Sequence, residues 1–275
     1  MEQVLTIDVG NGPPLVLIPG MQGRWEWMRP TVNALARHFR VLSFTLAGEW
    51  TSGDPLQPRL GFDSYTLQVD RVLGEARVES AIVCGVSYGG LIALRYASMR
   101  PNTVRQLVLA SALPPDYQPD ARYAFYKRAP VLLFPVFLLA SSRRVSPELH
   151  ATFPRLVDRA RFAARQGWRV LTAPVSPRRM RDRMERLADV DFEADVRRVQ
   201  APTLVVTGAE DLDRTVPPAL TRRYLDRIPG AELAVLEHTG HMGTITRPAE
   251  FANLIADFSS RYPDTARPAA RRMAV

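Results

Sequence analysis

The sequence predicts an α/β protein with a mostly parallel, doubly wound sheet and an inserted helical lid. Short apolar runs alternate with helix-like stretches at first; the alternation stops near residue 114 and resumes near residue 200. We therefore divide the chain into a core of residues 1–113 and 200–262, a helical lid of residues 114–199 and a disordered tail of residues 263–275.

Seven apolar runs are predicted as strands because they are short and bounded by turn residues. They cover residues 3–9, 14–18, 40–44, 81–84, 104–110, 202–208 and 231–236. In the core, we expect helices at residues 31–38, 64–77, 91–99, 218–228 and 248–261. In the lid, where prolines separate helix-like stretches, we expect helices at residues 121–128, 147–166 and 178–187.

The chain has 36 Lys and Arg residues against 28 Asp and Glu residues, a formal net charge of +8. Lys127 is its single lysine, and the arginines are spread along the chain apart from a cluster at residues 178–186. No recognisable nucleic-acid-binding motif accompanies them, so we expect no nucleic-acid partner. A basic surface can still favour anionic substrates or surfaces.

Cys84 is the only cysteine, which excludes an intrachain disulfide. The first residues do not resemble a signal peptide. The longest apolar run, residues 131–140, is interrupted by Pro135 and is too short to span a bilayer, although it could pack on the core, line a pocket or dock on a membrane. We expect a cytoplasmic protein without stable membrane insertion, and the sequence leaves the oligomeric state open.

Residues 85–90, Gly-Val-Ser-Tyr-Gly-Gly, stand between an apolar strand and a helix-like run. A nucleophile elbow, G-x-S-x-G, requires this strand–turn–helix context. Ser87 would occupy a strained turn with positive φ, which lifts its hydroxyl out of the fold. Gly85 and Gly89 would flank it because a side chain at either position collides with the neighbouring strand or helix. The alternative is a glycine-rich turn in a non-catalytic α/β protein.

A serine nucleophile needs a base, and His241 is the candidate. It lies in a glycine-flanked loop, residues 239–243, directly after the last predicted strand. That position is at the carboxyl edge of the sheet, the edge where Ser87 also lies and where ligands bind in open α/β sheets. His238 is the alternative base.

The imidazole in turn needs an acid that fixes its tautomer and stabilises the imidazolium. Three carboxylates, Glu210, Asp211 and Asp213, crowd the loop that follows the strand at residues 202–208. Asp211 lies three residues after a glycine, and Asp213 lies four residues before Pro217. We favour Asp213, and Asp211 stays open.

Backbone amides are the expected donors to a tetrahedral oxyanion. One is the amide of Tyr88, and the other is the amide of Met21, which follows the strand at residues 14–18. Both side chains would then be free to shape the pocket. We expect Trp25, Trp27 and Phe134 to line the substrate pocket, with packing on the core as the alternative for each.

Four motifs occur in the order found in one family: Pro-Gly-Met (19–21), Gly-Val-Ser-Tyr-Gly-Gly (85–90), the acidic loop (208–217) and Thr-Gly-His-Met-Gly (239–243). Over residues 4–262 the chain resembles the α/β-hydrolase fold family, in its serine hydrolase or esterase-like branch. It departs from many members at Thr45, where they carry aspartate. The resemblance implies Ser87 as nucleophile, His241 as base, Asp213 or Asp211 as acid, and Met21 and Tyr88 as oxyanion-hole donors.

These residues suggest hydrolysis of a small acyl ester or related carbonyl substrate through an acyl-enzyme. A carbon–carbon bond hydrolase of ring-cleavage products is an alternative with the same residues. A non-catalytic protein that binds a small apolar ligand is a second. The sequence implies no metal and no organic cofactor.

Overall fold

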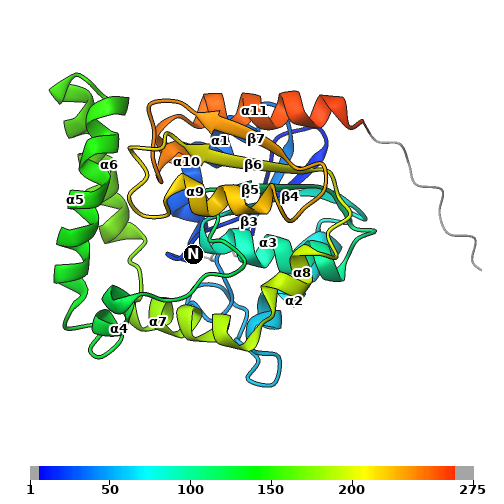
Figure 1. Cartoon of the computed structure of the whole chain (residues 1–275), viewed down its shortest axis with the longest axis horizontal. Helices are drawn as coiled ribbons and strands as arrows, with labels where there is room; N and C mark the ends of the chain where they lie inside the picture. Colours follow the sequence, from blue (N-terminus) through cyan, green and yellow to red (C-terminus); the bar gives the residue numbers. More distant parts are fainter. Residues whose placement is uncertain (1–5, 264–275) are drawn as a thin grey trace, which may run out of the picture.

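The computed structural model describes residues 6–263 and contains a seven-stranded sheet with helices on both faces (Figure 1). The strand order is β1-β3-β2-β4-β5-β6-β7, and only the pairing of β1 with β3 is antiparallel. The predicted α/β fold is therefore confirmed. The strands are β1 (Thr6–Val9), β2 (Pro14–Ile18), β3 (Arg40–Phe44), β4 (Ala81–Val86), β5 (Val104–Ala110), β6 (Thr203–Gly208) and β7 (Glu232–Leu236).

The strand ranges predicted from the sequence agree closely with those in the structure. Residues 3–5 of the first predicted strand lie outside the described residues. The predicted disordered tail also lies outside them, apart from Pro263. The strands are recognisable because their side chains are buried on both faces of a parallel sheet, which leaves continuous apolar runs in the sequence.

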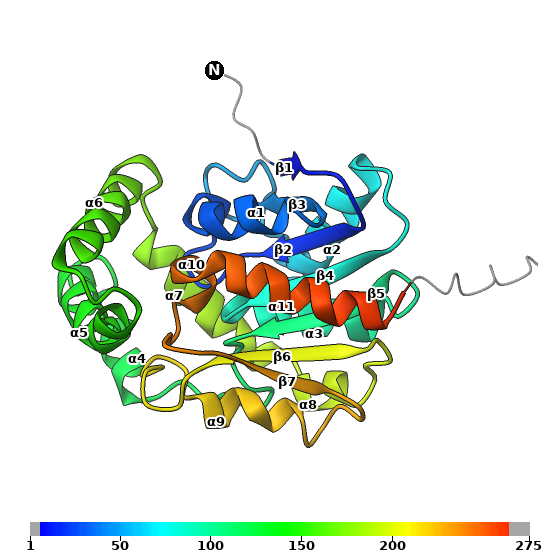
Figure 2. The same ribbon diagram turned by 90° about the horizontal axis from the view of Figure 1, so that it is seen from above.

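Alternate residues of the central strands belong to two apolar cores, one on each face of the sheet. Val16 of β2 belongs to the core that includes α2 (Ser64–Glu75) and α3 (Tyr88–Met99). Leu15 belongs to the core that includes α1 (Arg29–Leu35) and α11 (Pro248–Arg261). The sheet is thereby held between two helical layers (Figure 2).

Five α-helices separate β5 from β6 in the chain: α4 (Ala121–Tyr126), α5 (Phe134–Thr152), α6 (Leu156–Thr172), α7 (Pro177–Glu185) and α8 (Phe192–Val196). We call α4 to α7 the helical insert. In both views α5 and α6 stand together at one end of the sheet (Figures 1 and 2). Helix α8 instead packs on α3, with Phe192 and Val196 buried in the core.

The predicted helix at residues 147–166 is wrong, because two helices occupy this segment. Helix α5 ends at Thr152, and Phe153 adopts φ −123° and ψ 84°. The following residue, Pro154, disfavours helical geometry at Phe153. Helix α5 also begins earlier than expected, at Phe134, because Pro135 is tolerated in a first helical turn.

The remaining elements are short. Within residues 6–263, no helix has the length and apolar character needed to cross a bilayer. The short elements are η1 (Trp25–Met28), η2 (Gly61–Asp63), η3 (Arg186–Asp189), α9 (Pro218–Thr221), η4 (Arg222–Tyr224) and α10 (Gly243–Thr246).

Candidate active site

The turn between β4 and α3 has the strained geometry that its sequence predicts. Ser87 has φ 55° and ψ −119°, an unfavourable region for a residue with a Cβ. A Cβ added to Gly85 would lie 2.2 Å from the carbonyl oxygen of Gly89. A Cβ added to Gly89 would lie 2.5 Å from that of Ile18. The backbone therefore approaches too closely on both sides of Ser87 for any residue except glycine.

His241 reaches Ser87 from the loop after β7. Its Nε2 lies 3.1 Å from Ser87 Oγ, and its side chain is 17% exposed. The alternative base, His238, is exposed and has φ 58°. The structure thus brings His241, and not His238, to the serine.

Asp213 holds the other side of the imidazole. Its Oδ2 lies 3.2 Å from His241 Nδ1, and the residue is buried. The backbone N–H groups of Thr215 and Val216 both donate to Oδ1 at 2.9 Å, which fixes the carboxylate. Asp211, two residues earlier, is exposed to solvent and does not contact the imidazole.

The environment of His241 shifts its affinity for protons. Burial by itself would lower the pKa of His241, because it disfavours the charged imidazolium. The charge and the hydrogen bond of Asp213, together with the charge of Glu148, more than offset this, so the pKa of His241 lies above its ordinary value. The neutral imidazole, the form that can accept a proton from a neighbouring hydroxyl, therefore becomes the main form only at a higher pH than for an ordinary histidine.

The loop after β2 packs directly on the Ser87 turn. A Cβ added to Gly20 would lie 3.4 Å from Ser87 Cβ, so the loop that contains Met21 adjoins the serine. Tyr88 is the first residue of α3, where backbone N–H groups are free of helical partners. Its side chain does not shape a pocket, contrary to expectation: it is buried, and its hydroxyl donates to the carbonyl of Arg183 at 3.1 Å.

The three predicted pocket residues have different surroundings. Trp25 lines a cavity of about 820 Å³ between η1 and α6, which none of Ser87, Asp213 and His241 lines. Trp27 is not among the residues that line it; its Nε1 donates to the carbonyl of Ala173 in the segment after α6. Phe134 also lies outside this lining and stacks on Phe137 within α5, with ring centroids 6.0 Å apart.

A sequence model described as the alpha/beta hydrolase family matches residues 15–254, most of the chain. The chain belongs to the alpha/beta hydrolase family. The match includes every side chain of the site described above, from Met21 to His241.

Three relatives of this hydrolase are named for three different reactions. A candidate carbamate hydrolase of Pseudomonas syringae is 26% identical over 258 residues, which cover 92% of this chain and 96% of the relative. A 2-hydroxy-6-oxo-2,4-heptadienoate hydrolase of Pseudomonas putida is 27% identical, covering 91% and 90%. A pimeloyl-acyl-carrier-protein methyl ester esterase of Nitrosomonas europaea is 27% identical, covering 92% and 98%.

The insert of this hydrolase contacts the loop that carries His241, here called the histidine loop (residues 237–243), through helix α5. Glu148 and Thr152 are the two buried residues of that helix, and both are polar. The Met242 N–H donates to the Glu148 carboxylate at 3.0 and 3.1 Å, and the Thr152 hydroxyl donates to the carbonyl of His238 at 2.8 Å. Burial raises the pKa of Glu148. The sequence reasoning did not identify this contact, although spacing of four residues on a helix was a signal for it.

The insert also touches the loop after β2, through helix α7. Arg183 is 1% exposed and donates from Nη1 to the carbonyl of Met21 at 2.9 Å. Its Nη2 donates to Glu49 Oε1 at 2.5 Å, and Glu49 is 3% exposed. The sequence reasoning treated Arg183 only as part of a basic cluster. Nothing in a single sequence distinguishes it from its exposed neighbours.

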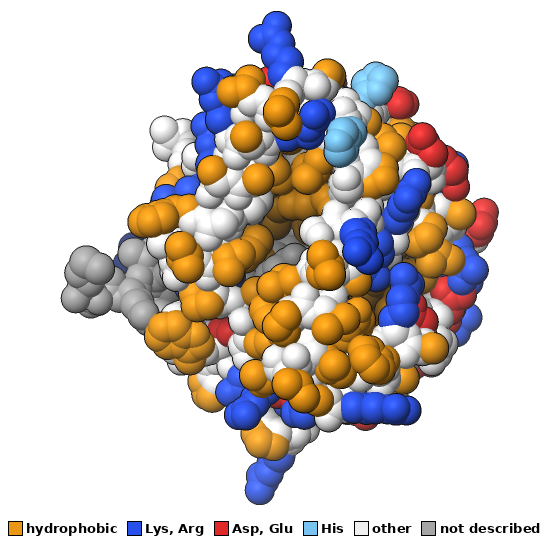
Figure 3. Space-filling view, turned by 90° about the vertical axis from the view of Figure 1, so that its left-hand side faces the viewer, with side chains coloured by type: hydrophobic (Ala, Val, Ile, Leu, Met, Phe, Trp, Pro, Cys, Tyr) orange, Lys and Arg blue, Asp and Glu red, His pale blue; other side chains and the backbone are white. Residues whose placement is uncertain are grey.

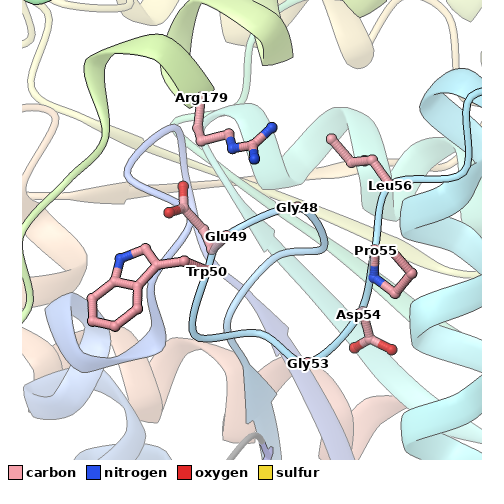
Figure 4. A pocket seen from close by; sticks show the side chains of 8 residues that line it. All are labelled: Gly48, Glu49, Trp50, Gly53, Asp54, Pro55, Leu56 and Arg179. Atoms are coloured by element: carbon pink, nitrogen blue, oxygen red, sulfur yellow. The ribbon is translucent and has the colours of Figure 1, made fainter.

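A second cavity, of about 430 Å³, lies over residues 48–56 and faces Arg179 (Figure 4). Figure 4 shows the Trp50 side chain turned away from this loop. None of Ser87, Asp213 and His241 lines the cavity, so it is separate from these three side chains. Within residues 6–263, no three His, Cys, Asp or Glu side chains are grouped in a way that could hold a metal ion.

Proposed function

We propose that this protein is a serine hydrolase that acts on a small acyl ester or related carbonyl substrate. Ser87 is the nucleophile, His241 the base and Asp213 the acid. One observation carries the proposal: a continuous hydrogen-bonded chain runs from Ser87 Oγ through His241, at 3.1 Å, to Asp213, at 3.2 Å. A binding protein has no use for this arrangement, whereas acyl transfer requires it.

In the proposed mechanism, Ser87 Oγ attacks the substrate carbonyl carbon while His241 Nε2 accepts the hydroxyl proton. The resulting oxyanion accepts hydrogen bonds from the backbone N–H groups of Met21 and Tyr88. His241 then delivers its proton to the leaving alkoxide, which departs as an alcohol and leaves an acyl-enzyme. Water attacks this ester, gives a proton to His241, and releases the acid as Ser87 recovers its proton.

The segment at residues 114–199 serves as a lid in this proposal and selects the substrate. Its contacts with the histidine loop and the loop after β2 support that role, because both loops border Ser87.

Carbon–carbon bond hydrolysis is the second candidate. The Pseudomonas putida relative is named for a 6-oxo-dienoate substrate, and its identity to this chain equals that of the ester-hydrolysing relative. Turnover of a vinylogous diketone, compared with turnover of simple esters, separates the two reactions.

Replacement of Ser87 tests the nucleophile. The Ser87→Ala variant is expected to lose roughly 10⁴-fold or more in kcat on p-nitrophenyl acetate and butyrate, because it removes the hydroxyl that lies 3.1 Å from His241 Nε2. Ser142→Ala, on the exposed side of α5, is the matched control and should keep full turnover. Unchanged turnover by a folded Ser87→Ala variant would exclude Ser87 as the nucleophile. Tight binding of an apolar ligand without turnover, retained in that variant, would instead indicate a binding protein.

A further inference from the structure

Helix α6 has its apolar side turned outward. Leu156 is 73% exposed, Trp168 67% and Leu171 77%, and no residue of the helix is buried. Its half-buried side carries mainly polar residues, among them Arg159 and Arg169. A helix on the surface of a globular protein normally has the opposite orientation, because burial of the apolar side stabilises it. The outward side of α6 is therefore suited to contact something outside the chain.

Apolar side chains on and before α5 extend this exposed region. Figure 3 views this side of the molecule and shows hydrophobic side chains spread across the face around a hollow, with Lys and Arg side chains among and beside them. Trp168 belongs both to this region and to the wall of the 820 Å³ cavity. We define the apolar insert surface as Val131, Leu132, Val136, Leu138, Leu139, Leu156, Val157, Trp168, Val170 and Leu171, each at least 40% exposed.

The charges around this surface are almost all positive. Residues 127–172 contain nine basic residues and two acidic ones, Glu148 and Asp158. Glu148 is buried against the histidine loop, which leaves Asp158 as the one acidic side chain in this segment that is not buried. Arg161 and Arg165 are exposed beside the apolar stripe of α6, and Arg161 lies 3.7 Å from Asp158.

We propose that the apolar insert surface docks peripherally on an anionic lipid interface. Leucine and tryptophan side chains flanked by arginines match such an interface, where apolar groups enter the acyl boundary and guanidinium groups meet phosphates. A second copy of this chain fits less well, because it would bring two arginine-rich surfaces together. Docking would place the mouth of the cavity next to the lipid.

Vesicle flotation of the full chain tests this proposal. The protein should float with phosphatidylcholine vesicles that contain phosphatidylglycerol, float poorly with pure phosphatidylcholine vesicles, and be released by added salt. Leu156→Ser and Leu171→Ser should each lower the partition coefficient roughly tenfold. Arg161→Gln and Arg165→Gln should each lower it about fivefold.

Trp168→Ser and Trp50→Ser form a matched pair, since Trp50 is 70% exposed but lies outside the insert. Only Trp168→Ser should weaken flotation, and circular dichroism should show both variants folded. Three results would overturn the proposal: no flotation with the anionic vesicles, flotation that none of the insert variants weakens, or a dimer in analytical ultracentrifugation that Leu171→Ser dissociates.

Discussion

Asp213 and Asp211 are alike in residue type and close in the sequence, but their surroundings in the structure differ. Both follow β6 on one loop, and the sequence allows either to be the partner of the imidazole. Two backbone N–H groups, from Thr215 and Val216, turn the Asp213 carboxylate inward, whereas Asp211 is exposed. From the sequence, the candidates for the residue that pairs with the imidazole could be restricted to this loop. The sequence could not select between two carboxylates, because the selection depends on where the loop amides point.

The raised pKa of His241 sets the expected pH dependence of activity. Only the neutral imidazole can accept the Ser87 proton, so kcat/KM should fall as the pH drops through this pKa, with a midpoint above about 6.5. Asp213→Asn should lower kcat roughly 10³- to 10⁴-fold. It should also move the midpoint to lower pH, because burial then dominates. Asp211→Asn is the control and should change neither quantity; the reverse pattern would make Asp211 the acid.

The insert helices are attached to the candidate site by polar side chains. Helix α5 reaches the loop of His241 with Glu148, and helix α7 reaches the loop after β2 with Arg183. Apolar periodicity does not reveal such contacts, because the partners are backbone groups that lie far away in the sequence. A helical insert could be expected from the sequence, but neither the bounds of α5 and α6 nor the way the insert docks.

Glu148 should influence the proton affinity of His241 through its charge. Its carboxylate favours the imidazolium, so Glu148→Gln should move the acid midpoint of kcat/KM to lower pH while the amide oxygen still accepts from Met242. The shift should be smaller than that of Asp213→Asn, since Asp213 contributes more to the raised pKa. Glu237→Gln, an exposed neighbour of the same loop, is the control. An identical midpoint in Glu148→Gln and the wild type would show that Glu148 has only a structural role.

Arg183 and Glu49 should be coupled in both stability and activity. Arg183→Ala leaves a buried carboxylate without its partner and should lower the free energy of unfolding by about 3–5 kcal/mol in urea denaturation. The double variant Arg183→Met with Glu49→Leu should regain most of that stability, because neither charge is then buried alone. Its kcat should stay reduced, since the Met21 carbonyl loses its donor. Recovery of both the stability and kcat would argue against a role for Arg183 in positioning the loop after β2.

Local sequence predicts the positions of the core strands and helices well, but it does not predict those of the insert. The strands from β2 to β7 and the helices α1, α2, α3 and α11 lie close to their predicted positions, because burial on a parallel sheet leaves compact apolar runs. The insert was less predictable. Its exposed apolar residues do not follow the usual rule that apolar residues face inward, and Pro154 separates two helices that composition alone would join.

The candidate site combines loops after β2, β4, β6 and β7 at the carboxyl edge of one sheet. Labelling with a fluorophosphonate, followed by mapping of the adduct by mass spectrometry, tests whether these loops form a reactive serine. We expect one adduct, on Ser87, that forms faster as the pH rises through the pKa of His241 and is absent in His241→Ala. An adduct on another residue, or none on the folded wild-type protein, would contradict the proposed activation of Ser87 by His241.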